Sequence, residues 1–497
     1  MRVTQLAGPA RRVPGYLVRA RSDSLVRNSL YLMASTVVTA ALGYVFWAVA
    51  AHVFTSQQVG IASAVISLCS TAALLTYLGS SAILIERLPA SEGSSEWTAI
   101  LIRVTLTTAA VTAVATAATV PLMLTSRDYR LFFSGPAPVI LAVAGAAAWT
   151  VVNLFGAACI AARRAGRLLS IQALISASKI LLAVLLAAAG SRAAGLVQAW
   201  AASTVLGIGT GAAWLIPRMR LGRRPGPRPR RQPAADFRLR SPARPRHKRA
   251  VTPPTAQSVR HLLGQHLTSV GGAVTPLVLP VLVVFRLGVT PNAYFYITWM
   301  MGAAFFMVSP SVAQAIFAEG VRAHADLRAV VVRALRVIFI LLIPAMAVMI
   351  AGGRLLLGLF GASYAAAGYG LLILLAISAL PDAVSNVAVA VFRVTGRLGY
   401  SAALNLGILV LTLTGAWILM PRLGIAGVGV AWLGAQVAGA IASAPGYARL
   451  RKPVTLHTLA AAPGDQLPAA LASQAGLLQL MDLARRQSID QVQGRPR

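Results

Sequence analysis

Acidic residues are scarce in this chain of 497 residues: Asp and Glu together number 12, and all charged residues make up only 11%. Soluble domains carry about 25% charged residues, so a water-soluble globular fold is excluded. The two cysteines, Cys69 and Cys159, lie in apolar stretches and fit neither a disulfide framework nor a metal site. Histidines and glycines form no H-E-x-x-H or G-x-x-x-x-G-K pattern. We therefore expect no enzyme activity, no metal and no cofactor.

Apolar residues are abundant instead. Hydrophobic residues make up 57% of the chain, and the mean hydropathy is +0.72. A helix needs about 20 apolar residues to cross a bilayer, and the sequence offers runs of this kind almost from end to end. It predicts an all-α polytopic membrane protein with about 12 transmembrane helices, at 29–53, 60–85, 98–124, 137–161, 168–190, 194–216, 261–285, 292–318, 329–351, 367–392, 399–420 and 424–446.

Basic residues set the expected topology. The net charge of +33 would indicate nucleic acid in a soluble chain, but Lys and Arg mark cytoplasmic loops in a membrane protein. With both termini in the cytoplasm, Lys179 lies within a span and almost all other basic residues lie on the cytoplasmic side. The first apolar run is too long for a cleavable signal. We expect a multi-pass protein of a bacterial-type cytoplasmic membrane, without nucleic acid as a partner. The external basic residues would be Arg127, Arg130, Arg192, Arg286, Arg354 and Arg422.

The spans fall into two sets of six. The expected division is a basic N-terminus (1–28), an N-terminal lobe (29–216), a linker rich in Pro and Arg (217–257), a C-terminal lobe (258–446) and a cytoplasmic tail (447–497). The linker is either attracted to anionic lipid headgroups or is a solvated connection whose charge fixes the topology. Within the tail, residues 467–486 are compatible with a short amphipathic helix.

The two halves resemble each other weakly. Arg-x-x-Gly-Arg-Leu occurs at 163–168 and again at 393–398, an offset of 230. Ala-Gly-x-x-x-Ala-Trp occurs at 194–200 and at 426–432, an offset of 232. Because each half has an even number of spans, both halves face the same way, and an axis along the membrane normal relates them. Transporters of this plan hold the substrate between the halves.

Two charged residues lie deep within expected spans. Asp382 follows Pro381 in the tenth span, and Lys179 lies about halfway along the fifth. A charge at the bilayer centre costs at least about 2.5 kcal/mol, so such residues are candidates for ion coupling. The alternative is a buried structural charge, with Asp382 neutralised by Lys179 or protonated. Near Asp382, one helix face also carries Ser378, Asn386 and Arg393.

The seventh span carries a polar stripe. His261, Gln265, Thr268, Gly272 and Thr275 stay within about 40° of one line on an ideal helix. Gly271, Gly272, Pro276 and Pro280 are expected to weaken this helix, and irregular backbone at membrane depth survives only where it is buried or lines a cavity. Three residues of the first span correspond to stripe positions at an offset of 233. The candidate substrate cavity therefore combines the stripe with Asn28, Ser35 and Thr39.

Aromatic side chains gather in the eighth span. Aromatic residues near a membrane interface usually anchor a helix there. The sharper alternative is a surface on which a sugar ring stacks. The residues concerned are Tyr294, Tyr296, Trp299, Phe305 and Phe306.

Several short segments of the chain resemble those of a known protein family. The segment VFTSQQVGIASAV, the segment LGSSAILIERLP and the two R-x-x-G-R-L turns are similar to the corresponding parts of bacterial polysaccharide flippases of the O-antigen and teichoic-acid type. These belong to the multidrug/oligosaccharidyl-lipid/polysaccharide exporter superfamily. The resemblance implies two six-helix lobes in a V, with spans 1, 2, 7 and 8 lining a cavity.

The resemblance also implies a function in cell-envelope and lipopolysaccharide synthesis. A lipid-linked oligosaccharide or polysaccharide precursor would cross the membrane by alternating access, driven by an H⁺ or Na⁺ gradient. The cavities of such proteins are often cationic, which suits a pyrophosphate. Here the predicted spans 1, 2, 7 and 8 contain no deep Arg or Lys. Arg103 in the third span, and Arg333 and Arg336 in the ninth, lie towards the cytoplasmic side.

Three other functions stay open at this stage. The first is a small-molecule or drug exporter. The second is a membrane glycan polymerase or ligase, although short external loops with a single carboxylate, Asp128, argue against it. The third is a non-transporting scaffold for envelope synthesis.

Overall fold

The computed structural model describes residues 24–91, 95–162, 164–215, 256–322 and 326–448. The basic N-terminus up to residue 23, most of the linker and the tail with the expected amphipathic helix lie outside these ranges. The described chain forms helices, which are α2 (Ser24–Val53), α3 (Ser56–Arg87), η1 (Pro89–Ser91), α4 (Ser95–Met123), α5 (Arg127–Phe132), α6 (Pro136–Ala161), α7 (Ala165–Ala188), α8 (Ala193–Leu215), α10 (Ala256–Leu287), α11 (Val289–Arg322), α12 (Leu327–Gly358), α13 (Ala362–Val394), α14 (Leu398–Leu423) and α15 (Ile425–Ala448).

The prediction of about 12 spans is confirmed. In the described part of the chain, 12 helices are long and apolar enough to cross a membrane. Their outer surfaces are apolar, as contact with lipid requires: Leu355 is 80% exposed, Val348 71% and Val114 70%. The sequence did not predict the single-turn η1 or the short α5, because neither has the length of a span. Several helices also run beyond the predicted limits; α12, for example, ends at Gly358 rather than at 351.

Two lobes repeat one packing plan. In the N-terminal lobe α2 packs on α7, and α3 and α4 pack on α6. In the C-terminal lobe α10 packs on α14, and α11 and α12 pack on α13. The helices α7 and α14, which begin at Ala165 and Leu398, are 233 residues apart. The lobes are therefore structural repeats, as the sequence predicted.

The R-x-x-G-R-L match, however, does not join equivalent positions. Gly396 lies after the end of α13 with φ +72°, where glycine avoids the strain of a left-handed backbone. Gly166 lies inside the first turn of α7 instead. The true counterparts are the N-cap residues Arg164 and Arg397, 233 residues apart. The offset of 230 is three residues short, so this resemblance between the halves is local.

The expected irregularity of the seventh span is also absent. α10 is continuous from Ala256 to Leu287, with Pro276 and Pro280 inside it. Proline is tolerated within a transmembrane helix because neighbouring helices and local adjustment satisfy the freed backbone groups. The backbone of α10 therefore gives no evidence for a cavity wall.

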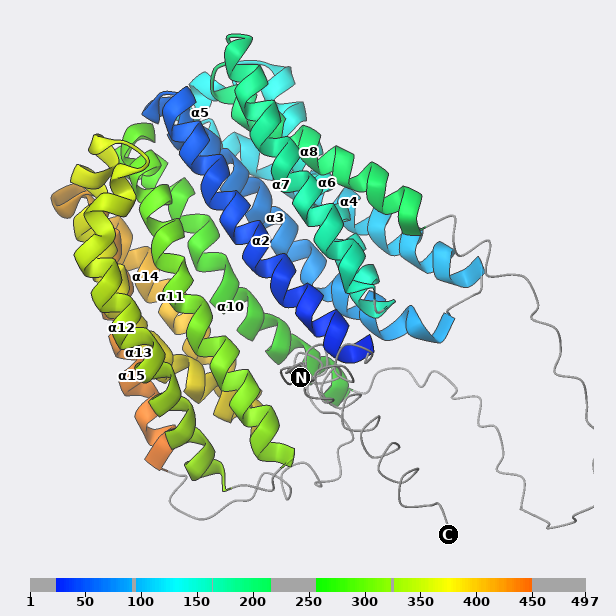
Figure 1. Cartoon of the computed structure of the whole chain (residues 1–497), viewed down its shortest axis with the longest axis vertical. Coiled ribbons are helices and arrows are strands. Elements are labelled where there is room, and N and C mark those ends of the chain that lie inside the picture. Colours follow the sequence, from blue (N-terminus) through cyan, green and yellow to red (C-terminus); the bar gives the residue numbers. More distant parts are fainter. Residues whose placement is uncertain (1–23, 92–94, 163, 216–255, 323–325, 449–497) are drawn as a thin grey trace, which may run out of the picture.

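The lobes meet at one end of the molecule. α3 packs on both α10 and α11, and buried apolar side chains from the two lobes join in one core that includes Phe46, Val65, Val284 and Ile297. In Figure 1 the two bundles lie closest near α5 and diverge towards the opposite ends of α2 and α11. We call the joined end the outer end, because the expected topology places it outside the cytoplasm.

Candidate functional site

The segment VFTSQQVG forms the start of α3 and its closest approach to the other lobe. Thr55 is the N-cap: its hydroxyl accepts from the backbone N–H of Gln58 (3.3 Å), and the Gln58 side chain accepts from the N–H of Thr55 (3.1 Å). This capping box fixes the first turn. Gly60 follows, and a Cβ there would lie 1.7 Å from the main-chain oxygen of Val289 in α11. Only glycine permits this backbone contact.

Asn292 of α11 completes the contact. Its Nδ2 donates to the main-chain oxygen of Gly60 (2.7 Å) and to Oγ of Ser63 (3.1 Å). Asn292 and Ser63 are fully buried. We call Gly60, Ser63, Val289 and Asn292 the outer clasp. It joins α3 of one lobe to α11 of the other through polar groups within an apolar seam.

Aromatic side chains extend the seam inward from the clasp. The rings of Trp47 in α2 and Tyr296 in α11 lie 4.7 Å apart, centroid to centroid. Further along, the hydroxyl of Tyr44 donates to the main-chain oxygen of Met300 (2.9 Å). These contacts close the seam in its outer half in the described state.

The short α5 caps the seam. Tyr129 is fully buried, its ring lies 5.2 Å from that of Phe285, and its hydroxyl donates to the main-chain oxygen of Val281 (3.4 Å). Burial raises the pKa of Tyr129, and the neighbouring Asp128 raises it further. The phenol therefore stays neutral over the ordinary pH range and keeps its proton for this bond.

The structure describes the side chains of only some of the predicted cavity residues. Asn28, His261 and Gln265 lie in α2 and α10, but their side chains are outside the description. Of the first-span group, Ser35 is buried, and Thr39 is half-buried with its hydroxyl on the main-chain oxygen of Ser35. Both sit in the part of α2 that precedes the seam residues. Their role as cavity lining stays a prediction.

Thr268 and Thr275 are buried in α10, with 0% and 1% exposure. Asn405 of α14 donates to the main-chain oxygen of Thr268 (2.8 Å), and a Cβ at Gly271 would lie 3.0 Å from Asn405 and Leu406. The stripe thus borders the α10–α14 packing inside the C-terminal lobe in this state. Sequence reasoning missed Asn405, because no local pattern connects it to α10.

Asp382 lies inside the C-terminal lobe, 6% exposed. The hydroxyl of Ser309 in α11 donates to its Oδ2 (3.1 Å), and Asn386 donates to its main-chain oxygen (3.1 Å). Pro310 and Pro381 stand next to the two bonded side chains, so each helix lacks one backbone hydrogen bond beside this carboxyl. Among the described residues, no cluster of His, Cys, Asp and Glu is suited to hold a metal ion.

Lys179 belongs to the other lobe. Its Nζ lies 4.4 Å from the ring centroid of Phe46, a cation–π contact between α7 and α2. The close partner of Asp382 is Ser309 instead. Neutralisation of one charge by the other, which the sequence left open, is therefore not what the structure shows.

The aromatic residues of the eighth span are mainly packing residues. Trp299 and Phe305 are 5% and 4% exposed, and the rings of Trp299 and Trp432 in α15 lie 5.2 Å apart. Tyr294 stacks edge-on against Tyr364. These contacts bind α11 to its own lobe, whereas the side chains of Tyr294, Tyr296 and Phe306 are half-buried.

Comparisons by sequence give no relative: no protein-family model matches the chain, and no curated protein matches it. Solved structures do resemble it. One is a multidrug resistance MATE family transporter of the MOP superfamily in its inward-facing conformation, with a TM-score of 0.54 and 17% identity over 88% of this chain and 96% of that chain. An outward-facing MATE transporter matches with a TM-score of 0.51 and 17% identity over 86% and 96%.

A MOP superfamily transporter from Pyrococcus furiosus is similar to the same extent, with a TM-score of 0.50 and 17% identity over 86% of this chain and 96% of that chain. It is described as having a binding pocket of reverse polarity that suggests a different function. Likeness at this level of identity establishes architecture. The chain has the all-helical, two-lobed fold of the MATE transporters.

Proposed function

We propose that the protein is a membrane transporter that works by alternating access and exports small amphipathic molecules. The observation that carries the proposal is the seam: two lobes of one packing plan are joined at the outer end by the clasp and diverge towards the other end. Lobes related in this way can rock about their contact, so that one end opens as the other closes. Transporters of similar fold have been captured in both inward-facing and outward-facing conformations.

The chemistry of the inner helices favours this substrate class. Residues 30–84, 262–285 and 290–320 contain no Lys or Arg. A pyrophosphate in the seam would thus meet no cation on α2, α3, α10 or α11 at membrane depth, whereas an amphipathic molecule would meet the apolar and aromatic surfaces that dominate there.

Asp382 is the proposed proton carrier. Its carboxyl is buried next to Ser309 of α11, the helix that also carries the clasp residue Asn292. An unneutralised carboxylate is costly in this place, so loss of the proton would favour a conformation in which water or a cation reaches the group. Lys179 is the second proposed coupling residue. We propose H⁺ as the coupling ion, because a single buried carboxyl carries a proton without further ligands.

A lipid-linked glycan flippase is the second candidate. It is favoured by the sequence resemblance of residues 53–65, which here build the capping box and the Gly60 contact. In that case the glycan would cross between the lobes while the lipid tail stays in the bilayer, and membrane lipids at the basic linker would assist. The expected location, the cytoplasmic membrane of a bacterium, suits both candidates.

One reconstitution tests the mechanism and separates the substrates. The variant Ser63→Cys/Asn292→Cys places two thiols across the clasp, where the native atoms are 3.1 Å apart. Both native cysteines are free and buried. In proteoliposomes with an imposed pH gradient, oxidation should stop efflux of a fluorescent amphipathic cation, and a reductant should restore it. Each single-cysteine variant is the control.

The same vesicles loaded with a lipid-linked oligosaccharide give the other arm. A change in glycan sidedness that stops when the two clasp thiols are oxidised, without cation efflux, would support the flippase. Transport of either substrate that continues through the oxidised clasp would refute alternating access at this seam.

A further inference from the structure

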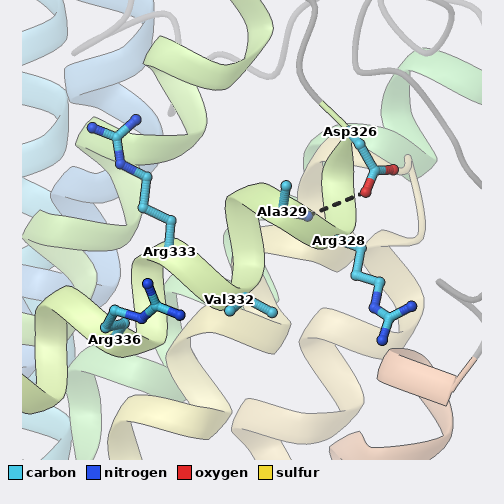
Figure 2. A pocket seen from close by; sticks show the side chains of 6 residues that line it. All are labelled: Asp326, Arg328, Ala329, Val332, Arg333 and Arg336. Carbon is cyan, nitrogen blue, oxygen red and sulfur yellow. Dashed lines mark hydrogen bonds between the residues drawn. The ribbon is translucent and has the colours of Figure 1, made fainter.

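The beginning of α12 carries a basic surface that the transport mechanism does not use. Arg328, Arg333 and Arg336 line an open hollow of about 580 Å³ together with Asp326, Ala329 and Val332. All three arginines are exposed. Figure 2 shows their side chains fanned out from one side of the helix, with those of Arg328 and Arg333 pointing apart.

The one carboxylate among the described lining residues of the hollow is already engaged. Asp326 is the N-cap of α12, and its Oδ2 accepts from the backbone N–H of Ala329 (3.2 Å). Among the described contacts, no ion pair joins Asp326 to Arg328 or Arg336, so the described lining of the hollow is cationic. An anionic group is the ligand that this surface fits.

The position of the arginines along α12 indicates the membrane interface. No charged residue lies between Arg336 and Arg354, a distance of about 27 Å along a helix, close to the thickness of about 30 Å of the hydrocarbon core. Arg354 lies 5.1 Å from the ring centroid of Tyr369, an arrangement typical of the opposite interface. Arg336 therefore lies at the hydrocarbon boundary, and Arg333 and Arg328 lie further out, at the level of headgroup phosphates.

The surface deeper in the membrane is suited to acyl chains. Ile340, Ile343 and Ala347 continue the helix face of Arg336 beyond the hollow; Ile340 is 63% and Ile343 55% exposed. α12 packs on α11 and α13 of its own lobe, so this face lies on the lobe's periphery. An occupant with a phosphate above and hydrocarbon below matches both parts.

We propose that the hollow at the start of α12 binds anionic phospholipids of the leaflet at that end, which is the cytoplasmic one in the expected topology. Because the side chains of Arg328 and Arg333 point apart (Figure 2), the hollow suits a layer of headgroups better than one small anion. The site is independent of transport and of the linker, and it is confined to one lobe. Arg103 is the structural counterpart of Arg336, but Ser95 and Ile100 occupy the positions that correspond to Arg328 and Arg333.

A local fluorescence experiment tests this proposal in the full-length protein. Val332→Cys places a label in the hollow, and Ala99→Cys places one at the equivalent exposed position of α4. The native cysteines are buried, so labelling is selective. Quenching by brominated phosphatidylglycerol is compared with quenching by brominated phosphatidylcholine at equal mole fraction.

We expect phosphatidylglycerol to be enriched at residue 332 and much less at residue 99. Each arginine near a membrane surface contributes about 1 kcal/mol, so each replacement among Arg328→Gln, Arg333→Gln and Arg336→Gln should lower the enrichment by about 5-fold. Arg103→Gln should leave it unchanged. Because all three side chains are exposed, these variants should fold, which size-exclusion chromatography verifies.

Several results would overturn the proposal. Equal enrichment at both labels would assign the effect to the overall charge of the protein. Enrichment that survives the triple variant would show that the arginines do not cause it. Displacement by inorganic phosphate, but not by chloride of the same ionic strength, would identify a small-anion site. Displacement by one equivalent of a polyprenyl diphosphate would make the hollow a site for a transported lipid.

Discussion

The side-chain amide of Asn292 donates to the main-chain oxygen of Gly60 across 2.7 Å, so an asparagine of one lobe holds the backbone of the other. Its Oδ1 is buried and has no partner. An unsatisfied buried acceptor costs about 1–3 kcal/mol, which offsets much of what the donated bonds contribute. The contact thus aligns the lobes but does not fasten them irreversibly, as a seam that opens in each transport cycle requires.

Replacing Asn292 should loosen the outer end. Asn292→Ala removes two hydrogen bonds, each with a net contribution of about 1 kcal/mol, but it also removes the unpartnered Oδ1. It should therefore shift the population towards outer opening by up to about 5-fold. Pulsed EPR between spin labels at the exposed Thr125 and Leu359 would show a new, longer distance. Asn153→Ala is the matched control, because Asn153 donates to Trp149 within its own helix (2.7 Å). An identical distance distribution in both variants would contradict a role of the clasp.

A methyl group at Gly60 should have a larger effect. The Cβ of Gly60→Ala would lie 1.7 Å from the oxygen of Val289, and backbone cannot rotate away as a side chain does. α3 and α11 must therefore separate, at a cost of about 1–3 kcal/mol. We expect a lower Tm in detergent and a population shifted towards outer opening.

Gly79 lies in the same helix and serves as the control for Gly60. Nothing lies within 4 Å of a Cβ at this position, and Gly79→Ala should keep or slightly raise the Tm because alanine favours the helix. Equal Tm values for Gly60→Ala and Gly79→Ala would mean that the close approach is not required.

Asp382→Asn should uncouple transport from the pH gradient. The amide keeps the size of the carboxyl and can still accept from Ser309, but it cannot carry an exchangeable charge. We expect substrate binding to persist while gradient-driven efflux falls by at least 10-fold and loses its pH dependence. Glu86→Gln, at an exposed position of α3, is the control. Undiminished transport across the pH range would remove Asp382 from the coupling mechanism.

Tyr129 should make the stability of the protein depend on pH in the alkaline range. Its pKa is raised by burial from an ordinary value of about 10. A group whose folded-state pKa is raised contributes stability below its unfolded value and loses that contribution as the pH rises towards the folded value. The Tm should therefore decline above about pH 10, and Tyr129→Phe should remove this part of the decline. Parallel Tm–pH curves for the two proteins would show that the phenol at Val281 is not a determinant.

The contact between Lys179 and Phe46 predicts an energetic coupling. A cation over an aromatic ring contributes about 0.5–2 kcal/mol, and Nζ lies 4.4 Å from the ring centroid. In a double-mutant cycle of Lys179→Met and Phe46→Leu, the double variant should therefore be more stable than the sum of the two single Tm changes predicts. Lys179→Met alone should be tolerated or stabilising, because the cost of the charge disappears with it. Strict additivity would mean that the ring does not hold the ammonium group.

Much of the fold followed from local properties of the sequence. A bilayer contains no water to hydrogen-bond an exposed backbone, so each apolar run of about 20 residues must form a helix. This constraint located the 12 candidate membrane-spanning helices among the described residues, although it did not fix where each one ends. Pro276 and Pro280 led to a wrong expectation, because the breaking strength of proline known from water does not apply in an apolar surrounding.

The candidate site was less accessible to sequence reasoning. Polarity and depth identified Asp382 and Lys179, but their partners Ser309 and Phe46 are distant in the chain. Tyr129 was not singled out from the sequence, because it lies in a segment too short to span a membrane. In the sequence, Gly60 stood out only as part of a family resemblance. Its structural role follows from its close contact with the main-chain oxygen of Val289 in α11.

The sequence by itself determined that this chain is helical and spans a membrane many times, because these properties depend on composition and periodicity within one segment. Short motifs that recur about 230 residues apart also indicated two related halves. Only the tertiary structure decided which faces of those helices meet. Helix faces in a membrane are all largely apolar, so hydrophobicity does not distinguish a seam from a lipid-facing surface. Close backbone approach and a few hydrogen bonds, such as that from Asn292 to Gly60, make the choice.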